Sequence, residues 1–296
     1  MKLTNYTNTR VLPVEFDYYA PKTLDEAVKI LTSVDNAYPL AGGLDLLVFI
    51  KLGFLRPRAL VNVKSIQGLR YISDDGDSVK IGSTTTVLDL ERSELVRRHL
   101  PLLYRVSRDF SSMQVRSMTT VGGNLASASP ASDLATALLA LDARIGIYGP
   151  SGYREVPIDS FYLGPRKTVL ARGELLAYVK VRKSAAGEGF GYQRIARIYE
   201  DIAKVIVAAR VRIEDGKFSE VAISLGSVAP RVIRSRSVEQ ALLGRPASQS
   251  VIDEASRLTV NDISPIDDMR STAEYRRDVA PVLVRRAILE AVSEVV

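Results

Sequence analysis

The amino-acid sequence predicts an α+β fold in which an α/β domain is followed by an antiparallel sheet covered by helices. Up to about residue 181, strand-like and helix-like patterns alternate along the chain, which is typical of α/β folds. From residue 182 to 296, three long β-rich segments come first and helical segments follow, which is typical of a sheet with helices on one face. We expect a first domain at 1–181, divided into subdomains of about 1–57 and 58–181, and a second domain at 182–296.

The first subdomain begins with an apolar and aromatic stretch at 14–18, which we expect to form a short strand. Thr23 and Glu26 have the spacing of a helix capping box, so a helix should start there. A second short strand is expected at 39–41. The segment 44–53 should then form a helix that ends at its final glycine.

The second subdomain contains two predicted β-hairpins and several helices. One hairpin turns at Asp75-Gly76 and the other at 150–152, where glycine and its neighbours permit tight turns. The hydrophobic pattern predicts a strand at 59–63 and helices at 86–100, 102–110 and 133–142.

The second domain has the composition of a sheet followed by a helical layer. Pro281 is a candidate position for a kink or a break in its last helix. The β-rich segments lie at 190–196, 203–213 and 219–229, and helices are expected at 238–244, 249–260 and about 272–294.

Composition restricts the chemistry that this chain can perform alone. It contains no cysteine, which excludes disulfides, a thiolate nucleophile and cysteine-ligated iron–sulfur clusters. The one histidine, His99, stands at the end of a predicted helix, where a positive charge is favourable. A zinc site built from histidine and cysteine is therefore excluded as well. Redox chemistry in this chain would need a borrowed cofactor.

Charge and hydropathy indicate the partners that we do not expect. The net charge is +6, but the basic residues are interleaved with acidic ones and form no basic tract, so we expect no nucleic-acid partner. No apolar run is long enough to span a bilayer, so we expect no membrane association. The N-terminus lacks the apolar core of a signal peptide, and we expect a cytoplasmic location.

Two glycine pairs are candidates for a phosphate site. Gly42-Gly43 follows an expected strand and precedes a helix, Gly122-Gly123 is expected to do much the same, and Ser132 is placed to cap the helix at 133–142. A phosphate approaches the backbone closely only where side chains are missing. The alternative is that each pair only provides turn geometry. Two such pairs in one domain favour a diphosphate held between them.

Asp133 refines this expectation. A carboxylate next to a diphosphate is repulsive unless it accepts hydrogen bonds from hydroxyl groups, which ribose or ribityl chains supply. Its alternative role is to favour the helix dipole from the first turn. Neither a GxGxxG dinucleotide motif nor a GxxxxGK[ST] motif is present, so a nicotinamide cofactor or a nucleoside triphosphate is not indicated.

The chain resembles the medium, FAD-binding subunit of the molybdenum hydroxylases, the family of xanthine, aldehyde and carbon monoxide dehydrogenases. The specific segments are AGGLDLL at 41–47 and TTVGGNLASASPASDLATALLALDA at 119–143. Similar segments follow the family's order at 81–91, 163–170, 200–205, 227–235 and 267–287.

This resemblance implies an FAD-binding domain of the vanillyl-alcohol-oxidase (PCMH-like) type and a set of FAD-contacting residues. Two loops would hold the diphosphate from opposite sides, Asp133 would bind a sugar or ribityl hydroxyl, and Phe110 and Ser111 would lie near the adenine half. Ile202 would pack near the isoalloxazine ring, with an ordinary core strand residue as the alternative. The loop residues are Leu40, Ala41, Gly42, Gly43, Leu44 and Asp45 on one side and Thr120, Gly123, Asn124 and Ser127 on the other.

Leu44 departs from the family pattern, which usually has threonine or serine at this position. A hydroxyl donor to the phosphate is then missing, so backbone donors would have to make that contact. The only histidine, His99, lies outside the matching flavin segments, so we expect FAD to be bound non-covalently. The resemblance implies no catalytic residue and no metal ligand in this chain.

The function implied by the resemblance is electron transfer in a complex of three kinds of subunit. A large subunit with molybdenum-pterin would oxidise the substrate, a small subunit with iron–sulfur clusters would relay electrons, and FAD on this chain would pass them to an external acceptor. An aldehyde is the favoured substrate, with carbon monoxide and xanthine as alternatives. The other candidates are a stand-alone FAD-dependent oxidoreductase and an assembly subunit that has lost FAD.

Overall fold

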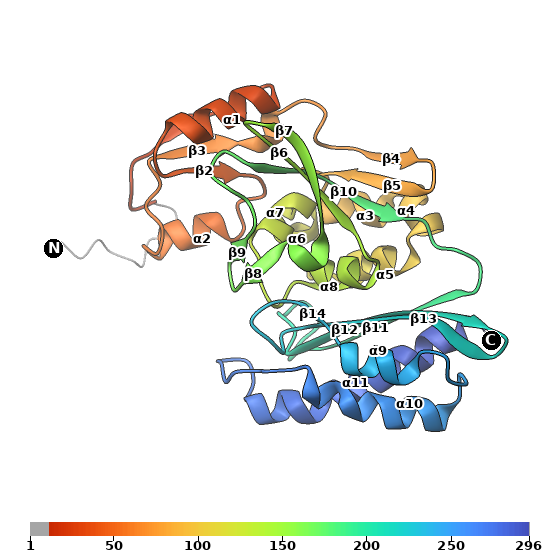
Figure 1. The fold of residues 1–296 in the computed structure, drawn as a ribbon. Coiled ribbons are helices and arrows are strands. Elements are labelled where there is room, and N and C mark those ends of the chain that lie inside the picture. Colours follow the sequence, from red (N-terminus) through yellow and green to blue (C-terminus); the bar gives the residue numbers. More distant parts are fainter. Residues whose placement is uncertain (1–11, 296) are drawn as a thin grey trace.

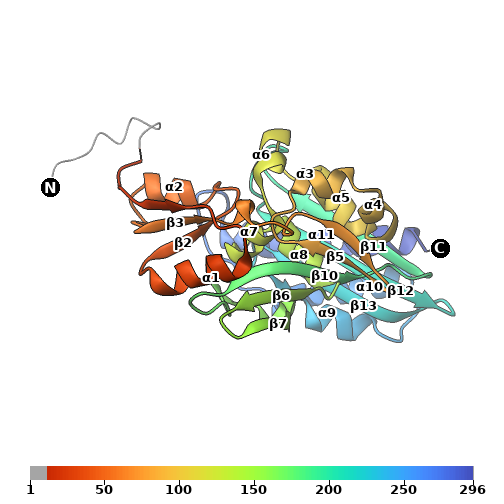
Figure 2. The same cartoon turned by 90° about the horizontal axis from the view of Figure 1, so that it is seen from above.

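The computed structural model describes residues 12–295, which fold into an α+β structure of three successive parts (Figure 1). The first part is a parallel sheet with the strand order β1-β3-β2, flanked by two helices. It forms a lobe to one side of the other parts (Figure 2). Its elements are β1 (Asp17–Tyr19), α1 (Leu24–Ser33), β2 (Ala37–Leu40), α2 (Leu46–Lys51) and β3 (Ala59–Asn62).

The elements expected in this lobe are present, with three differences. The strand expected at 59–63, in the second subdomain, is β3, the central strand of this sheet. The first strand begins at Asp17 and not at residue 14, because only Asp17–Tyr19 pair with β3. The capping box at the start of α1 is half formed. Thr23 accepts a hydrogen bond from the Glu26 N–H, but the Glu26 carboxylate accepts from the Lys22 N–H and not from Thr23.

The second part is an antiparallel five-stranded sheet with the order β4-β5-β10-β6-β7. Helices α3 to α8 lie between this sheet and the C-terminal sheet (Figure 1). The strands are β4 (Ile72–Asp75), β5 (Ser78–Gly82), β6 (Arg144–Gly149), β7 (Gly152–Pro157) and β10 (Leu175–Arg182), with a separate ribbon of β8 (Tyr162–Gly164) and β9 (Lys167–Thr168). The helices are α3 (Val87–Arg92), α4 (Glu94–His99), α5 (Pro101–Asp109), α6 (Met113–Met118), α7 (Val121–Ala126) and α8 (Asp133–Ala140).

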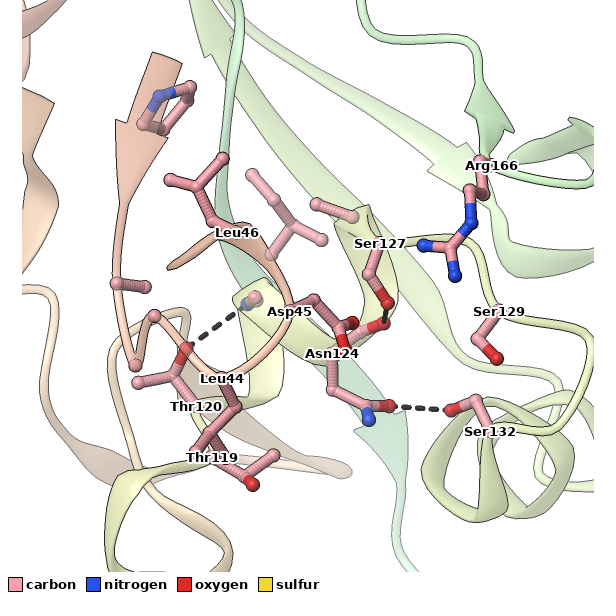
Figure 3. A pocket seen from close by; sticks show the side chains of 18 of the residues that line it. Leu44, Asp45, Leu46, Thr119, Thr120, Asn124, Ser127, Ser129, Ser132 and Arg166 are labelled. Atoms are coloured by element: carbon pink, nitrogen blue, oxygen red, sulfur yellow. Dashed lines mark hydrogen bonds between the residues drawn. The ribbon is translucent and has the colours of Figure 1, made fainter. Parts of the chain in front are cut away.

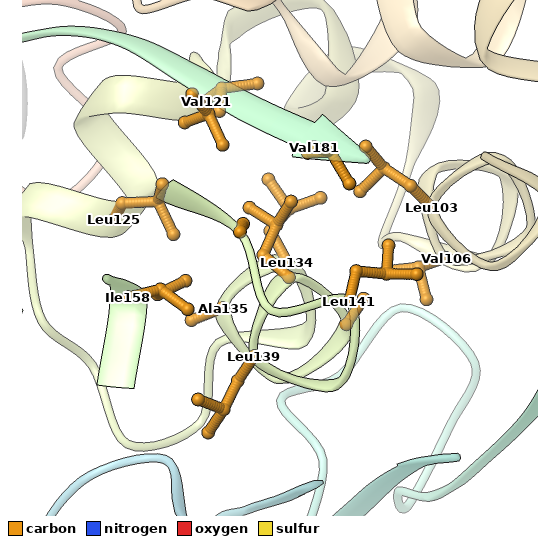
Figure 4. Close-up of a cluster of buried hydrophobic side chains, with 14 of the residues drawn as sticks. Leu103, Val106, Val121, Leu125, Leu134, Ala135, Leu139, Leu141, Ile158 and Val181 are labelled. Carbon is orange, nitrogen blue, oxygen red and sulfur yellow. The ribbon is translucent and has the colours of Figure 1, made fainter. Parts of the chain in front are cut away.

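Helix α8 is the centre of the molecule, and all of its residues are buried. It packs on α5 and on the C-terminal strands β12 (Val205–Glu214) and β13 (Lys217–Gly226), so apolar side chains are favourable on every face of the helix. Leu134, Leu139 and Leu141 meet Leu103 and Val181 in the same core (Figure 4).

Helices α6 and α7 were not predicted from the sequence. The prediction that Gly122-Gly123 forms a turn between a strand and a helix is wrong, because both glycines lie in the first turn of α7. Gly122 is needed there for packing, since a Cβ atom would lie 2.6 Å from the Cβ of Ser83. The helix expected at 86–100 is divided into α3 and α4 because Ser93 caps the second of them.

The third part is an antiparallel sheet, β11-β12-β13-β14, whose outer face is covered by α9, α10 and α11 (Figure 1). Pro281 neither ends nor divides α11, which continues from Ala273 to Ser293. This helix lies directly on Gly191 of β11, where a Cβ atom would be 1.9 Å from the Ala287 carbonyl oxygen. The elements are β11 (Glu188–Ile195), β12 (Val205–Glu214), β13 (Lys217–Gly226), β14 (Ile233–Arg234), α9 (Arg236–Leu242), α10 (Gln249–Ser256) and α11 (Ala273–Ser293).

Within residues 12–295, no helix is both long and apolar enough to cross a membrane.

A buried ion-pair network joins the second and third parts. The Arg210 side chain, 9% exposed, pairs with the Glu188 carboxylate, 1% exposed, at 3.0 Å and with Asp142 at 2.6 Å. Its Nε donates to the Ala140 carbonyl at the end of α8. Arg210 therefore fixes the C-terminal sheet against α8, which begins at the predicted site residue Asp133.

We expect Arg210→Met to lower the free energy of unfolding by about 3 kcal/mol, because the buried Glu188 carboxylate loses a buried cationic partner. Arg212→Met is the matched control on the same strand. The Arg212 side chain is 33% exposed and its partners Glu214 and Glu220 are exposed, so its loss should cost about 1 kcal/mol or less. Urea unfolding of both variants checks this, and equal destabilisation would contradict it.

Candidate functional site

A cavity of about 1040 Å³ lies between the N-terminal lobe, helices α6 to α8, the β8–β9 ribbon and the segment after β11. Its volume is at the upper end of the range for small-molecule and cofactor sites. Leu40 is the only predicted residue that does not line it; this residue ends β2, with its side chain next to Gly43. The predicted residues that do line it are Ala41, Gly42, Gly43, Leu44, Asp45, Phe110, Ser111, Thr120, Gly123, Asn124, Ser127, Asp133 and Ile202.

The loop between β2 and α2 supplies backbone donors to this cavity. The N–H groups from Gly42 to Asp45 have no hydrogen-bond acceptor within residues 12–295. Gly43 has a φ of 77°, a left-handed conformation that glycine adopts without strain. Successive unpaired N–H groups in such a turn can bind an anion. The missing hydroxyl at Leu44 therefore leaves a loop that still has free donors.

Gly42 has a different role from Gly43. A Cβ atom at Gly42 would lie 2.1 Å from the carbonyl oxygen of Met118, the last residue of α6. The backbone at Gly42 therefore lies directly against the end of α6. The second glycine pair is also close to this loop, because a Cβ atom at Gly123 would lie 3.5 Å from the Ala41 Cβ. The two glycine pairs, far apart in sequence, thus face each other across one end of the cavity.

The N-terminus of α7 has no free backbone donors. The Gly123 N–H donates to the Thr120 hydroxyl at 3.1 Å, which is the N-cap of this helix. The neighbouring N–H groups donate to carbonyl oxygens of Ser83, Thr85 and Thr120. The second glycine pair therefore allows close approach, but any polar contact to a ligand from this side must come from side chains.

Asn124 is placed to provide such a contact. The Ser132 hydroxyl accepts a hydrogen bond from the Ala135 N–H as the N-cap of α8, so its own proton is free for the Asn124 Oδ1 at 2.5 Å (Figure 3). This bond orients the Asn124 amide so that its NH₂ group is left for the cavity. Ser127, one turn later, lies on the same side and donates to the Asn124 carbonyl at 2.9 Å.

Asp133 is held by two side chains that the sequence did not indicate. The Tyr192 hydroxyl donates to its Oδ1 at 2.6 Å, and the Arg194 Nε lies 3.4 Å from the same oxygen. Oδ2 is therefore the oxygen left for a ligand hydroxyl. Burial raises the pKa of the Asp133 carboxyl, while Arg194 and the Tyr192 hydroxyl act in the opposite direction.

Arg194 also anchors the segment that carries Ile202. Its guanidinium donates to the carbonyl oxygens of Tyr199 and Asp201, both at 2.6 Å. Ile202 lies outside any strand and is 46% exposed, so the alternative that it is a core strand residue is wrong. Alternate residues of a strand share one face, which is why Tyr192 and Arg194 of β11 reach Asp133 together.

The expected positions of the two ends of FAD meet at one wall. The Ser111 hydroxyl donates to the Glu200 carbonyl at 3.2 Å, so Phe110 and Ser111, expected near adenine, lie beside the segment of Ile202, expected near the isoalloxazine ring. The two assignments therefore place both ends of FAD beside one wall, and each of them stays a prediction.

The opposite wall is apolar and aromatic, and sequence reasoning did not identify it. Arg166, on the turn between β8 and β9, reaches this wall from the other side of the cavity, with its guanidinium 4.3 Å from the centre of the Phe49 ring. The apolar side chains of this wall are Tyr38, Pro39, Leu46, Phe49, Phe54, Leu55, Leu170 and Leu175. Their sequence pattern is that of ordinary core residues, so only the fold reveals their shared position.

Comparison with known proteins agrees with this architecture. The model of the FAD binding domain in molybdopterin dehydrogenases matches residues 14–182, and that of the carbon monoxide dehydrogenase flavoprotein C-terminal domain matches residues 190–291. The carbon monoxide dehydrogenase medium chain of Hydrogenophaga pseudoflava is 33% identical over 279 residues, 94% of this chain and 97% of the relative.

Two further similarities extend over the same length. The glyceraldehyde dehydrogenase medium chain of Sulfolobus acidocaldarius is 31% identical, over 94% of this chain and 99% of the relative. A solved structure of carbon monoxide dehydrogenase from Hydrogenophaga pseudoflava superposes with a TM-score of 0.93 at 34% identity, covering 96% of this chain and 99% of that chain. This chain therefore belongs to the family of FAD-binding medium subunits of the molybdenum hydroxylases.

Proposed function

We propose that the cavity holds one FAD non-covalently and that this chain passes electrons from clusters on a partner chain to an external acceptor. The observation that carries the proposal is the pairing of free N–H groups at Gly42 to Asp45 with the oriented Asn124 amide of helix α7. Donors on both sides of a narrow gap suit a diphosphate. When bound, FAD supplies the redox chemistry, and the protein positions it and sets its surroundings.

The walls of the cavity suggest how the cofactor is oriented. The wall of Arg194, Asp133 and Ile202 suits the isoalloxazine ring and its ribityl chain, because Ile202 offers an apolar surface and Asp133 Oδ2 can accept from a hydroxyl. The aromatic wall around Phe49 and Phe54 suits the adenine ring, which stacks on such side chains. This orientation keeps the expected role of Ile202 and moves Phe110 and Ser111 to the ring end.

The partners follow from what this chain lacks. Without cysteine it cannot ligate an iron–sulfur cluster, so a small iron–sulfur subunit must deliver the electrons and a large molybdenum-pterin subunit must oxidise the substrate. The relatives named above act, by their names, on carbon monoxide and on an aldehyde. We favour an aldehyde as the substrate of the complex. The expected cytoplasmic location stays a prediction.

Simple observations distinguish the two other candidate functions from the proposed one. A stand-alone oxidoreductase needs its own acid–base group at the site, and the buried carboxylate of Asp133 is already bonded to Tyr192 and Arg194. An assembly subunit without FAD would purify colourless. Co-purification with cluster-bearing chains argues against the first candidate, and yellow flavin colour argues against the second.

We expect acid precipitation of the purified protein to release all of its flavin into the supernatant as FAD, about one per chain. The only histidine, His99, ends α4 and is not among the residues that line the cavity, and the chain has no cysteine, so the usual residues for a covalent flavin link are absent from the site. Chromatography of the supernatant identifies the flavin. Flavin that stays on the protein pellet, or FMN in place of FAD, would contradict the prediction.

A further inference from the structure

Arg166 stands on the cavity wall that faces the first glycine loop. It occupies the turn of the β8–β9 ribbon, and its guanidinium extends toward the side of the cavity where Ser127 and Ser129 lie (Figure 3). The N-terminal lobe provides the other wall here, through Phe49 of α2. Arg166 therefore reaches across the cavity from one part of the molecule to another.

The backbone of Arg166 is held in an unfavourable conformation. Its φ is 57°, in the left-handed region that non-glycine residues rarely adopt. Its N–H donates at 3.1 Å to the carbonyl oxygen of Ala128, which has a φ of 47°. Two left-handed residues joined by one hydrogen bond place this side chain at the cavity. Strain of this kind collects at ligand-binding positions.

The guanidinium of Arg166 is fixed in place but not neutralised. It stacks on the Phe49 ring, and it makes no ion pair with an acidic side chain within residues 12–295. Stacking on an aromatic ring leaves the in-plane N–H donors of arginine available. This is unusual in a cavity whose wall includes several acids, namely Asp45, Asp133, Glu174, Glu200 and Asp201.

The other arginine on the cavity wall is already engaged. Arg194 donates to the carbonyl oxygens of Tyr199 and Asp201 and lies beside Asp133. A diphosphate brings two negative charges next to carboxylates, and backbone N–H groups alone offer only partial charges. Among the described residues that line the cavity, Arg166 is thus the cation left to balance a diphosphate.

We propose that Arg166 is the cationic partner of the FAD diphosphate, held in position by the Phe49 ring and by the hydrogen bond to Ala128. The proposal rests on the proposed function, since it assigns a further binding residue to the same cofactor. It also explains how the chain tolerates Leu44. A charged, bidentate donor on the opposite wall replaces the hydroxyl donor that the first loop lacks.

The test measures binding of FAD and of riboflavin to the full-length protein after flavin removal, by flavin fluorescence at several salt concentrations. Riboflavin carries the isoalloxazine ring and the ribityl chain but no phosphate. Arg166→Gln should weaken FAD binding by roughly tenfold to a hundredfold, because it removes a charged hydrogen-bonding partner. Arg166→Gln should leave riboflavin binding unchanged, and Arg166→Lys should keep a large part of the FAD affinity.

Arg172→Gln is the matched control. It removes the same charge close by in sequence, but Arg172 is exposed, pairs with Asp35 and is not among the residues that line the cavity. If Arg166→Gln binds FAD as tightly as the parent, or loses riboflavin and FAD equally, the proposal is wrong. Loss of FAD in Arg166→Lys to the same extent as in Arg166→Gln also overturns it. Failure of the parent protein to bind FAD would instead overturn the proposed function.

Discussion

Gly123→Val should yield folded protein that purifies largely without flavin. Gly123 lies in a helical turn with no positive φ, so its backbone accepts a side chain, and the new Cβ meets only the Thr120 Oγ1 at 2.7 Å and the Ala41 Cβ at 3.5 Å. The methyl groups of valine would then project between α7 and the loop of Gly42 and Gly43. Displacing the Thr120 cap should cost about 1 kcal/mol of stability.

The expected loss of FAD affinity is about a hundredfold or more, equivalent to losing charged hydrogen bonds worth roughly 3 kcal/mol. The flavin-to-protein absorbance ratio measures it, and circular dichroism confirms that the variant is folded. Gly122→Val is the contrasting variant, because its Cβ would lie 2.9 Å from the Ser83 carbonyl oxygen and should damage the fold. Normal flavin content in folded Gly123→Val would show that this glycine has only a structural role.

The isolated chain should oxidise no aldehyde, purine or carbon monoxide. Substrate oxidation in this family takes place at a molybdenum centre, and electrons reach FAD through clusters held by cysteine thiolates, which this chain cannot supply. Its flavin should nevertheless accept electrons from a chemical reductant and pass them to an artificial dye. Steady-state assays with each substrate class and with the dye check both halves of the prediction.

Two controls sharpen this prediction. Flavin-free protein should not reduce the dye, which shows that the activity belongs to the bound cofactor. Gly123→Val should lose dye reduction in proportion to its lost flavin. Substrate turnover by the isolated chain would instead support the stand-alone oxidoreductase.

The fold was largely predictable because its main elements carry strong local signals. Helix α8 has an N-cap at Ser132 and a mostly apolar run, and strand β12 is rich in β-branched residues. Helices α6 and α7 were not predicted because both are short and because the two glycines of α7 lower its helix propensity. Glycine at 122 is required by Ser83, a contact that no local pattern reveals.

The sequence predicted many of the residues that line the cavity, but neither their hydrogen bonds nor the two arginines beside them. The two glycine pairs and Asp133 were identified from the sequence, because adjacent glycines and a helix N-cap are recognisable in it. The hydrogen bonds of the α7 N–H groups could not be predicted, because two of their acceptors are carbonyl oxygens of Ser83 and Thr85 on another segment. Arg166 and Arg194 were missed for the same reason, as their neighbours in space are distant in the chain.

The central claim is that electrons enter this chain from a cluster-bearing partner and not from the substrate itself. Mixing the flavin-loaded chain anaerobically with substrate, with and without the iron–sulfur and molybdenum subunits, and recording the flavin absorbance tests it most directly. We expect the flavin to be bleached only when both partner subunits are present. Bleaching by substrate with this chain alone, or with the molybdenum subunit but no iron–sulfur subunit, would contradict the account.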